Sequence, residues 1–173
     1  MTRKESLATM MGIGHLPYAQ GTVASFTVLI ESYLVYTLLS WLSIPSQGLW
    51  MGVLYGISCL TWSWITVWAA DEMIETYGPD PSALVSDEAA GMSFVISVMF
   101  LLGEFYGDAL QMKGWITIAL AVCFFRVYDI TKPLGIRRLE RLSGGNGILL
   151  DDLAAAFAAI ATTVALMIAS TMI

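Results

Sequence analysis

Carboxylates and cations occur together in one segment of the chain, FFRVYDITKPLGIRRLERLSGGNGILLDD, residues 124–152. The members that suit ligand chemistry are Arg126, Asp129, Lys132, Arg137, Asp151 and Asp152. Carboxylate oxygens are the ligands of Mg²⁺, which often shares a substrate phosphate with the protein. Arginine and lysine bind phosphate oxygens. The segment therefore indicates metal-assisted chemistry on a phosphate.

A second acidic pair, Asp87-Glu88, stands before an apolar run in the same way that Asp151-Asp152 does. One explanation is helix capping, because acids in a first turn stabilise a helix by about 0.3 to 1 kcal/mol each. Two pairs at one membrane face, each opening a membrane helix, favour a shared Mg²⁺ site instead.

Arg126, Asp129 and Lys132 are spaced by three residues, which keeps them on one side of a helix. An ion-pair ladder would explain this spacing. In the functional interpretation Asp129 is a metal ligand or base, and the two cations hold phosphate oxygens. Arg137 is the next substrate-binding candidate, whereas Arg138 and Arg141 suit anionic lipid headgroups.

The first polar stretch, GIGHLPYAQGTVAS at 12–25, carries the single histidine. His15 and Thr22 are predicted to line the same site, although a lone histidine is commonly a packed side chain and Thr22 could cap a helix. The glycine-rich SGGNGI at 143–148 is predicted to be a loop whose amides turn toward an anion. Asp80, between two prolines, is typical of a rigid turn.

Composition places these residues at a membrane. The chain has 173 residues, of which 57% are hydrophobic and 13% charged, with mean hydropathy +0.73. Soluble domains carry about 25% charged residues. We therefore expect an integral membrane protein with one domain, 1–173. The chain offers no continuous basic surface for nucleic acid.

Apolar runs of helix length predict an all-α membrane bundle, because open sheets leave unpaired backbone groups in lipid. The charge-free interval 32–70 is too long for one crossing, which takes about 20 residues. A turn signal at 43–48 divides it. The predicted helices, about five, lie near 22–43, 49–69, 89–103, 114–128 and 153–173. Runs 89–103 and 114–128 are short, so they extend into polar flanks or lie partly in the interface.

Orientation follows from lysine and arginine. With the N-terminus in the cytoplasm, segments 1–21, 70–88 and 129–152 lie inside and hold most of the cations, while Lys113 lies outside. This distribution satisfies the positive-inside rule. It also predicts that every polar motif shares one face of the membrane.

The two cysteines, Cys59 and Cys123, lie in apolar runs, where a thiol stays protonated and inert. A cysteine phosphatase mechanism is therefore disfavoured. A mechanism with two histidines is excluded by the single His15, and no D-x-D spacing occurs. The N-terminal segment is not typical of a cleavable signal peptide, since its apolar region is interrupted by glycines and His15.

Three stretches of the chain resemble the phosphatidylglycerophosphatase A family. GIGHLPYAQGTVAS is similar to the family's G-x-G-x-x-P-x-A-P-G-T-x-G-S, and DPSALVSDEAAG to its D-P-x-x-I-V-x-D-E-x-x-G. Segment 124–152 is similar to F-R-x-F-D-x-x-K-P-x-P-I-R followed by G-G-x-G-I-M-x-D-D. Departures at Gln20, Ala24, Gly135 and Ala156 concern loop geometry more than chemistry.

The resemblance implies a Mg²⁺-dependent lipid phosphatase of the bacterial inner membrane. Its substrate would be phosphatidylglycerophosphate in the cytoplasmic leaflet, and its products phosphatidylglycerol and phosphate. Asp87, Asp129 and Asp152 would be catalytic. Arg126, Lys132, Arg137, Thr22 and His15 would bind substrate. The metal ligands would be Asp87, Glu88, Asp129, Asp151 and Asp152.

Two alternatives stay open. One is a phosphatase of another lipid phosphate, such as phosphatidate. The other is a non-enzymatic transporter or lipid-binding protein, whose charges would line a path at mid-depth. Apart from Glu31 and Glu104 the charges collect at one face, which favours a headgroup site. The number of ions, the attacking group (water or an aspartate) and the oligomeric state are not predicted.

Overall fold

A computed structural model describes residues 1–173 except 80, 111, 113, 134 and 173, and it leaves out the side chains of 140 and 141. The predictions for Asp80, Lys113 and the Arg141 side chain therefore lie outside the described residues.

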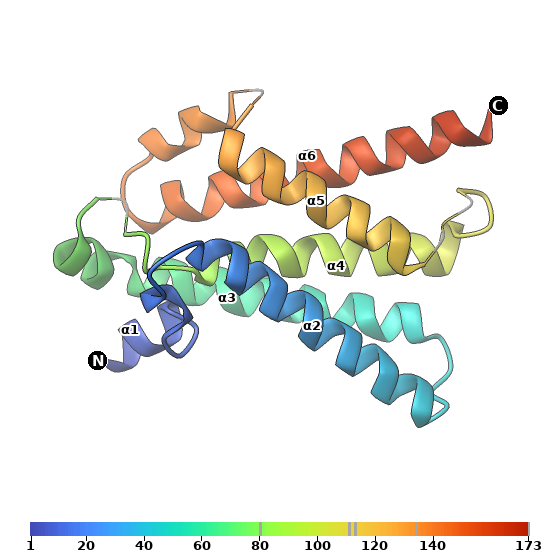
Figure 1. Cartoon of the computed structure of the whole chain (residues 1–173), viewed down its shortest axis with the longest axis horizontal. Helices are drawn as coiled ribbons and strands as arrows, with labels where there is room; N and C mark the ends of the chain where they lie inside the picture. The colour runs from blue at the N-terminus through green and yellow to red at the C-terminus, as the bar shows by residue number, and fades with distance from the viewer. Residues whose placement is uncertain (80, 111, 113, 134, 173) are drawn as a thin grey trace.

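The described chain is built of helices and contains no strand, so the predicted all-α class is confirmed (Figure 1). In chain order the elements are α1 (Arg3–Ala8), η1 (Ile13–His15), α2 (Gln20–Trp41), α3 (Gln47–Tyr77), α4 (Ser86–Tyr106), α5 (Trp115–Thr131), η2 (Ile136–Arg141) and α6 (Gly145–Thr171).

Four helices, α2, α3, α4 and α6, are long and apolar enough to cross a bilayer. The fifth long helix, α5, has 17 residues and packs along α6. At 1.5 Å per residue it is roughly 25 Å long, somewhat short of a hydrocarbon core. The prediction of about five transmembrane or membrane-embedded helices is confirmed, and the chain is a multi-pass membrane protein.

The start of the last helix differs from the prediction. Helix α6 begins at Gly145 rather than at 153, so much of the expected glycine loop is helical. A Cβ at Gly145 would lie 2.7 Å from Ala70 Cβ and 2.8 Å from Val67 Cα on α3. The glycine therefore allows close packing of α6 on α3, which the sequence pattern alone made look like a turn.

Helix α4 is the centre of the bundle and packs against α2, α3, α5 and α6. Its core side chains, such as Val95 and Ile96, are fully buried. Where α4, α5 and α6 meet, a Cβ on Gly91 would lie 2.8 Å from the Phe125 ring and 3.3 Å from the Asp152 carbonyl oxygen. Small residues let membrane helices approach closely. Gly91 thus brings the start of α4 beside α6.

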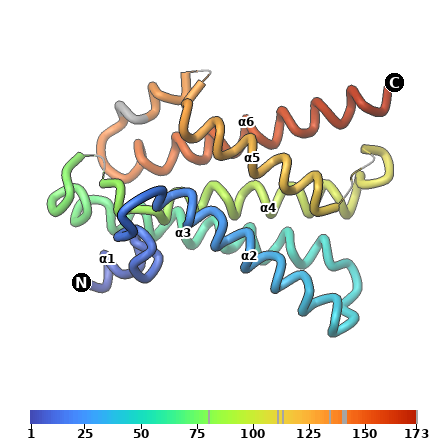
Figure 2. Tube along the Cα trace, in the orientation of Figure 1, coloured from blue at the N-terminus to red at the C-terminus, as the bar shows by residue number. Residues whose placement is uncertain are grey.

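The three polar segments gather at one end of the bundle (Figure 2). This end holds α1, the start of α2, the end of α3, the start of α4, η2 and the start of α6. The α2–α3 connection and the C-terminus lie at the other end (Figure 1). The prediction that the motifs share one end is therefore confirmed.

Candidate functional site

Three carboxylates converge where α4 meets α6. Asp87 and Glu88 belong to the first turn of α4, and Asp152 belongs to α6. One ligand oxygen from each lies within 4.8 Å of the other two. Asp87 and Asp152 are only 8% and 3% exposed, so this three-carboxylate cluster is largely withdrawn from water.

The chemistry of the cluster fits a divalent cation. Asp87 Oδ1, Glu88 Oε2 and Asp152 Oδ2 are buried and accept no hydrogen bond from any described residue. Buried charges are costly unless they are paired or coordinate a metal. The donor set is oxygen only, which is the preference of Mg²⁺.

Helix ends explain only part of the placement of these acids. The N-cap of α4 is Val85, which makes no side-chain cap hydrogen bond. Asp151 and Asp152 stand in the second turn of α6, beyond the first-turn positions where the helix dipole favours acids most. The dipole of α4 favours Asp87 and Glu88 in its first turn, but helix ends do not account for the convergence of these two acids with Asp152.

Asp129, near the end of α5, places its carboxyl within hydrogen-bonding reach of Asp152. Its other neighbour is Arg126, whose Nη1 donates to Asp129 Oδ2 at 2.6 Å. The same guanidinium donates to α2, through Nη2 to Thr22 Oγ1 at 3.2 Å and Nη1 to Ser25 Oγ at 3.3 Å. Arg126 therefore holds Asp129 beside the cluster and ties α5 to α2.

Lys132 forms an ion pair with Asp151 on the wall of the same site. A cavity of about 420 Å³ opens here. Its charged lining residues are Asp87, Glu88, Asp129, Lys132, Asp151 and Asp152. Asp151 thus lines the cavity as the ion-pair partner of Lys132. Among the described residues, it is not one of the three carboxylates whose ligand oxygens lie within 4.8 Å of one another.

Thr22 lies at the site, but not as a cap. The N-cap of α2 is Ala19, and the Thr22 hydroxyl accepts from Arg126. Its neighbour Gly21 makes a further contact at the site, which the sequence does not predict. A Cβ there would lie 1.9 Å from Glu88 Oε1, so the first turn of α2 rests directly on that carboxylate. No charge or spacing signals this contact, because it depends on how α2 crosses α4.

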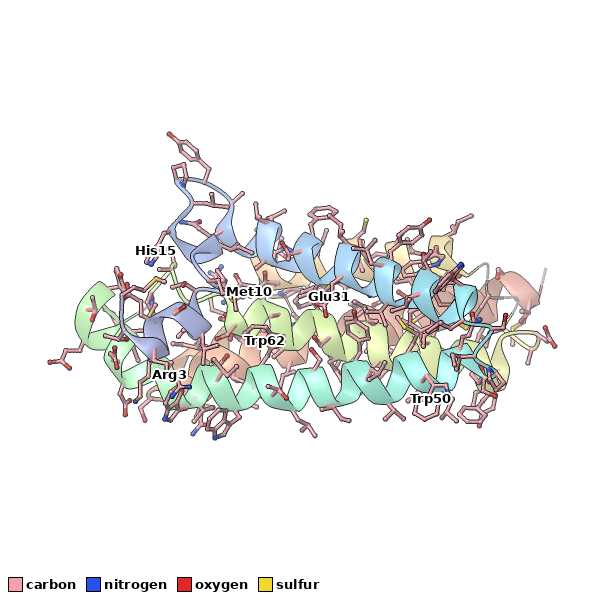
Figure 3. All side chains as sticks on the ribbon, turned by 90° about the horizontal axis from the view of Figure 1, so that it is seen from below. Arg3, Met10, His15, Glu31, Trp50 and Trp62 are labelled. Atoms are coloured by element: carbon pink, nitrogen blue, oxygen red, sulfur yellow. The ribbon has the colours of Figure 1, made fainter. Side chains whose placement is uncertain are left out.

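Of the predicted substrate-binding residues, Lys132 lines the cavity, and Thr22 and Arg126 contact each other beside it. His15 and Arg137 lie away from this site. His15 Nε2 lies 3.4 Å from Glu5 Oε1, and its ring centroid lies 6.0 Å from that of Tyr77 (Figure 3). The Tyr77 hydroxyl donates to Glu5 at 2.5 Å, which lowers the pKa of the Glu5 carboxyl and keeps it charged beside His15. Arg137 is exposed on η2. Substrate binding by either residue stays a prediction.

Comparison with known proteins assigns this arrangement to a family. The sequence profile described as Phosphatidylglycerophosphatase A matches residues 6–167, which include every residue of the cluster and its cationic surround. The chain belongs to the phosphatidylglycerophosphatase A family. Membership makes it a lipid phosphatase, and the predicted family resemblance is confirmed.

Relatives carry two kinds of name. The chain is 31% identical over 149 residues to a putative phosphatidylinositol-3-phosphatase of Bacteroides thetaiotaomicron, covering 86% of this chain and 84% of the relative. It is 29% identical over 150 residues to phosphatidylglycerophosphatase A of Escherichia coli, covering 86% and 74%. With the Haemophilus influenzae protein of that name it is 30% identical over 155 residues, covering 89% and 82%. No solved structure gives a significant match.

Proposed function

We propose that this chain is a Mg²⁺-dependent phosphatidylglycerophosphatase, which hydrolyses phosphatidylglycerophosphate to phosphatidylglycerol and phosphate. We place the reaction at the cytoplasmic leaflet of a bacterial inner membrane, the side that the positive-inside rule assigns to the polar segments. The observation that carries the proposal is the convergence of Asp87, Glu88 and Asp152 within 4.8 Å at one end of an apolar bundle.

The position of the cavity suits a phosphate on a lipid headgroup. It lies at the polar end, beside helices whose outer faces are apolar. Lys132 lines it and supplies positive charge for phosphate oxygens. A lipid held in the leaflet could therefore present its phosphate to the carboxylates without leaving the membrane.

Asp87, Glu88 and Asp152 would hold the cation, with Asp129 next to them. Bound Mg²⁺ would supply electrostatic stabilisation of a phosphoryl group. Asp129 is the residue placed to accept a proton from water or to attack phosphorus, because it lies beside the cluster while Arg126 fixes its orientation. Lys132 would stabilise charge that develops on the phosphate.

The proposal is tested by phosphate release from purified protein on a panel of lipid phosphates. The panel contains phosphatidylglycerophosphate, phosphatidate and phosphatidylinositol 3-phosphate of equal chain length, each with Mg²⁺ or with EDTA. The last lipid is included because one relative is named for it. We expect Mg²⁺-dependent release, fastest from phosphatidylglycerophosphate. Equal or faster release from another lipid would reassign the substrate, and full activity in EDTA would remove the metal.

A variant at the site and a control variant outside it distinguish loss of a catalytic group from general damage to the fold. Asp129→Asn is expected to reduce kcat by about a hundredfold or more, the usual contribution of a positioned acid or base. Asp108→Asn is the matched control, since Asp108 is an exposed carboxylate outside the cavity, beyond the far end of α4. Near-normal turnover in Asp129→Asn would show that its assigned role is wrong.

Beryllium fluoride distinguishes the two routes for attack. It mimics a phosphoryl group on an aspartate, so stable trapping at Asp129 would indicate an aspartyl phosphate. Failure to trap any carboxylate, together with inversion of configuration at phosphorus in a substrate whose phosphate is made chiral with oxygen isotopes, would indicate direct attack by water.

A further inference from the structure

Two helices that carry site residues, α2 and α5, leave an apolar groove between them. The groove has a volume of about 390 Å³ and is lined by Leu29, Ile30, Tyr33, Trp115 and Ala119. Its surface is almost entirely apolar. In Figure 1, α5 is drawn above α4 and α2 below it, and the paler α3 lies behind α2.

The groove is bounded by two contacts between the helices. At the polar end, Arg126 of α5 donates to Thr22 and Ser25 of α2. Deeper in the bundle, the Trp115 ring makes an edge contact with Tyr33, with centroids 5.4 Å apart. These ties fix the spacing of two helices that otherwise pack mainly on α4 and α6. The width of the groove is therefore fixed by contacts between α2 and α5 at both of its ends.

The depth of the groove matches the leaflet that contains the site. Leu29 follows Thr22 by seven residues, and Ala119 precedes Arg126 by seven, so both lie roughly 10 Å below the guanidinium at 1.5 Å per residue. Tyr33 and Trp115 are each eleven residues away and lie roughly 16 Å below it, so the groove extends to about the bilayer midplane. One leaflet contributes about 15 Å of hydrocarbon. A lipid whose phosphate reaches the carboxylates thus has its acyl region at the level of the groove.

We infer that this groove binds an acyl chain of the phospholipid substrate and makes the enzyme selective for membrane-length chains. The inference rests on the proposed function and assigns the substrate-binding role to α2 and α5 below the headgroup cavity. The same two helices line the phosphate cavity, α2 through Gly21 and α5 through Asp129, so a lipid bound there has its acyl chains beside the groove. Leu29 and Ala119 then act by orienting the lipid, not by touching phosphorus.

The test fills the groove. Ala119→Trp places a large ring in the space, and Ala119 is exposed there, so the change does not overpack the core. For a phosphatidylglycerophosphate with long chains we expect KM to rise about tenfold or more with little change in kcat. For a dihexanoyl version of the same lipid we expect KM and kcat near the wild-type values. Ala161→Trp, at an exposed position on α6 outside the groove, is the matched control.

The possible results distinguish failure of the acyl-chain groove from failure of the proposed function. A loss that is the same for long and short chains, or no loss for either, would overturn the acyl-chain groove in an enzyme that remains active. A loss of the same size in Ala161→Trp would also overturn it. Absence of phosphate release from every lipid by the wild type would instead overturn the proposed function.

A second measurement does not depend on turnover. Phosphatidylglycerophosphate carrying a diazirine in mid-chain is photolysed with the protein in vesicles, and the labelled peptides are identified. We expect label at 29–33 and 115–119 that excess unlabelled substrate removes and Ala119→Trp abolishes. Label spread evenly over α3 and α6, or unaffected by competition, would show contact with bulk lipid and refute the groove.

Discussion

Mutual repulsion of the three carboxylates predicts that removal of one of them stabilises the protein in the absence of metal, although the same change is expected to lower activity. Ligand oxygens of Asp87, Glu88 and Asp152 lie within 4.8 Å of one another. At that separation and an effective dielectric constant of 20, two unit charges repel by about 3.5 kcal/mol. Without a cation the cluster therefore destabilises the folded protein, and removing one charge should relieve it.

Asp152→Asn is the change that tests this reasoning. If the cluster carries one proton both in the wild type and in the variant, the substitution removes the one remaining pair of like charges, and we expect a gain of about 3 kcal/mol in the absence of metal. Its new amide can also donate to a neighbouring carboxylate. For a chain of this size the gain corresponds to a rise in Tm of roughly 6 to 12 °C.

The assay is thermal unfolding in detergent at mildly alkaline pH, first in EDTA and then over a Mg²⁺ titration. Wild type should gain about 2.7 kcal/mol at a hundred times Kd. Asp152→Asn should start higher and gain little. Asp108→Asn, at the opposite end, should follow the wild type. A lower Tm for Asp152→Asn in EDTA, or equal gains with Mg²⁺, would refute the convergence of these carboxylates on one ion.

Three further predictions concern neighbours of the cluster. Gly21→Ala should raise the apparent Kd for Mg²⁺, measured from the Mg²⁺-dependent rise in Tm, by about tenfold, because the new Cβ displaces the flexible Glu88 carboxylate. Stability in EDTA should change little. An unchanged Mg²⁺ titration would disprove the contact. Arg126→Lys should lower kcat in phosphate release, since a single ammonium cannot reproduce the contacts to both α5 and α2, and wild-type kcat would show that Asp129 needs no such support. Cys59→Ser and Cys123→Ser should keep wild-type turnover, and its loss in either folded variant would reopen a thiol mechanism.

The sequence is sufficient to predict which residues share an end of the bundle. An apolar run that crosses a membrane reverses the side of the next polar segment, so 70–88 and 129–152 must meet. The acids in these segments then stand out, because few other charges occur nearby. This count of crossings places Asp87 and Asp152 at the same end of the bundle, and the close packing of α4 and α6 at Gly91 then brings them together.

Local geometry was harder to predict. Glycines occur both in loops and where a helix start packs tightly on a neighbour, so the sequence wrongly predicts a loop at Gly145. The contact of Gly21 with Glu88 depends on the crossing of α2 over α4. His15 was grouped with Thr22 because they share a motif, but the turn at η1 directs it toward Glu5 instead.

In the three-carboxylate cluster, all three side chains belong to helices and none to a loop. Gly91 sets how near α4 and α6 can come. The spacing of the three carboxylates therefore depends on the tilt of α4 and α6, which a bilayer adjusts when its thickness departs from the protein's apolar length. We expect acyl-chain length of the surrounding lipid to tune ion affinity, so that membrane thickness itself becomes an input to catalysis.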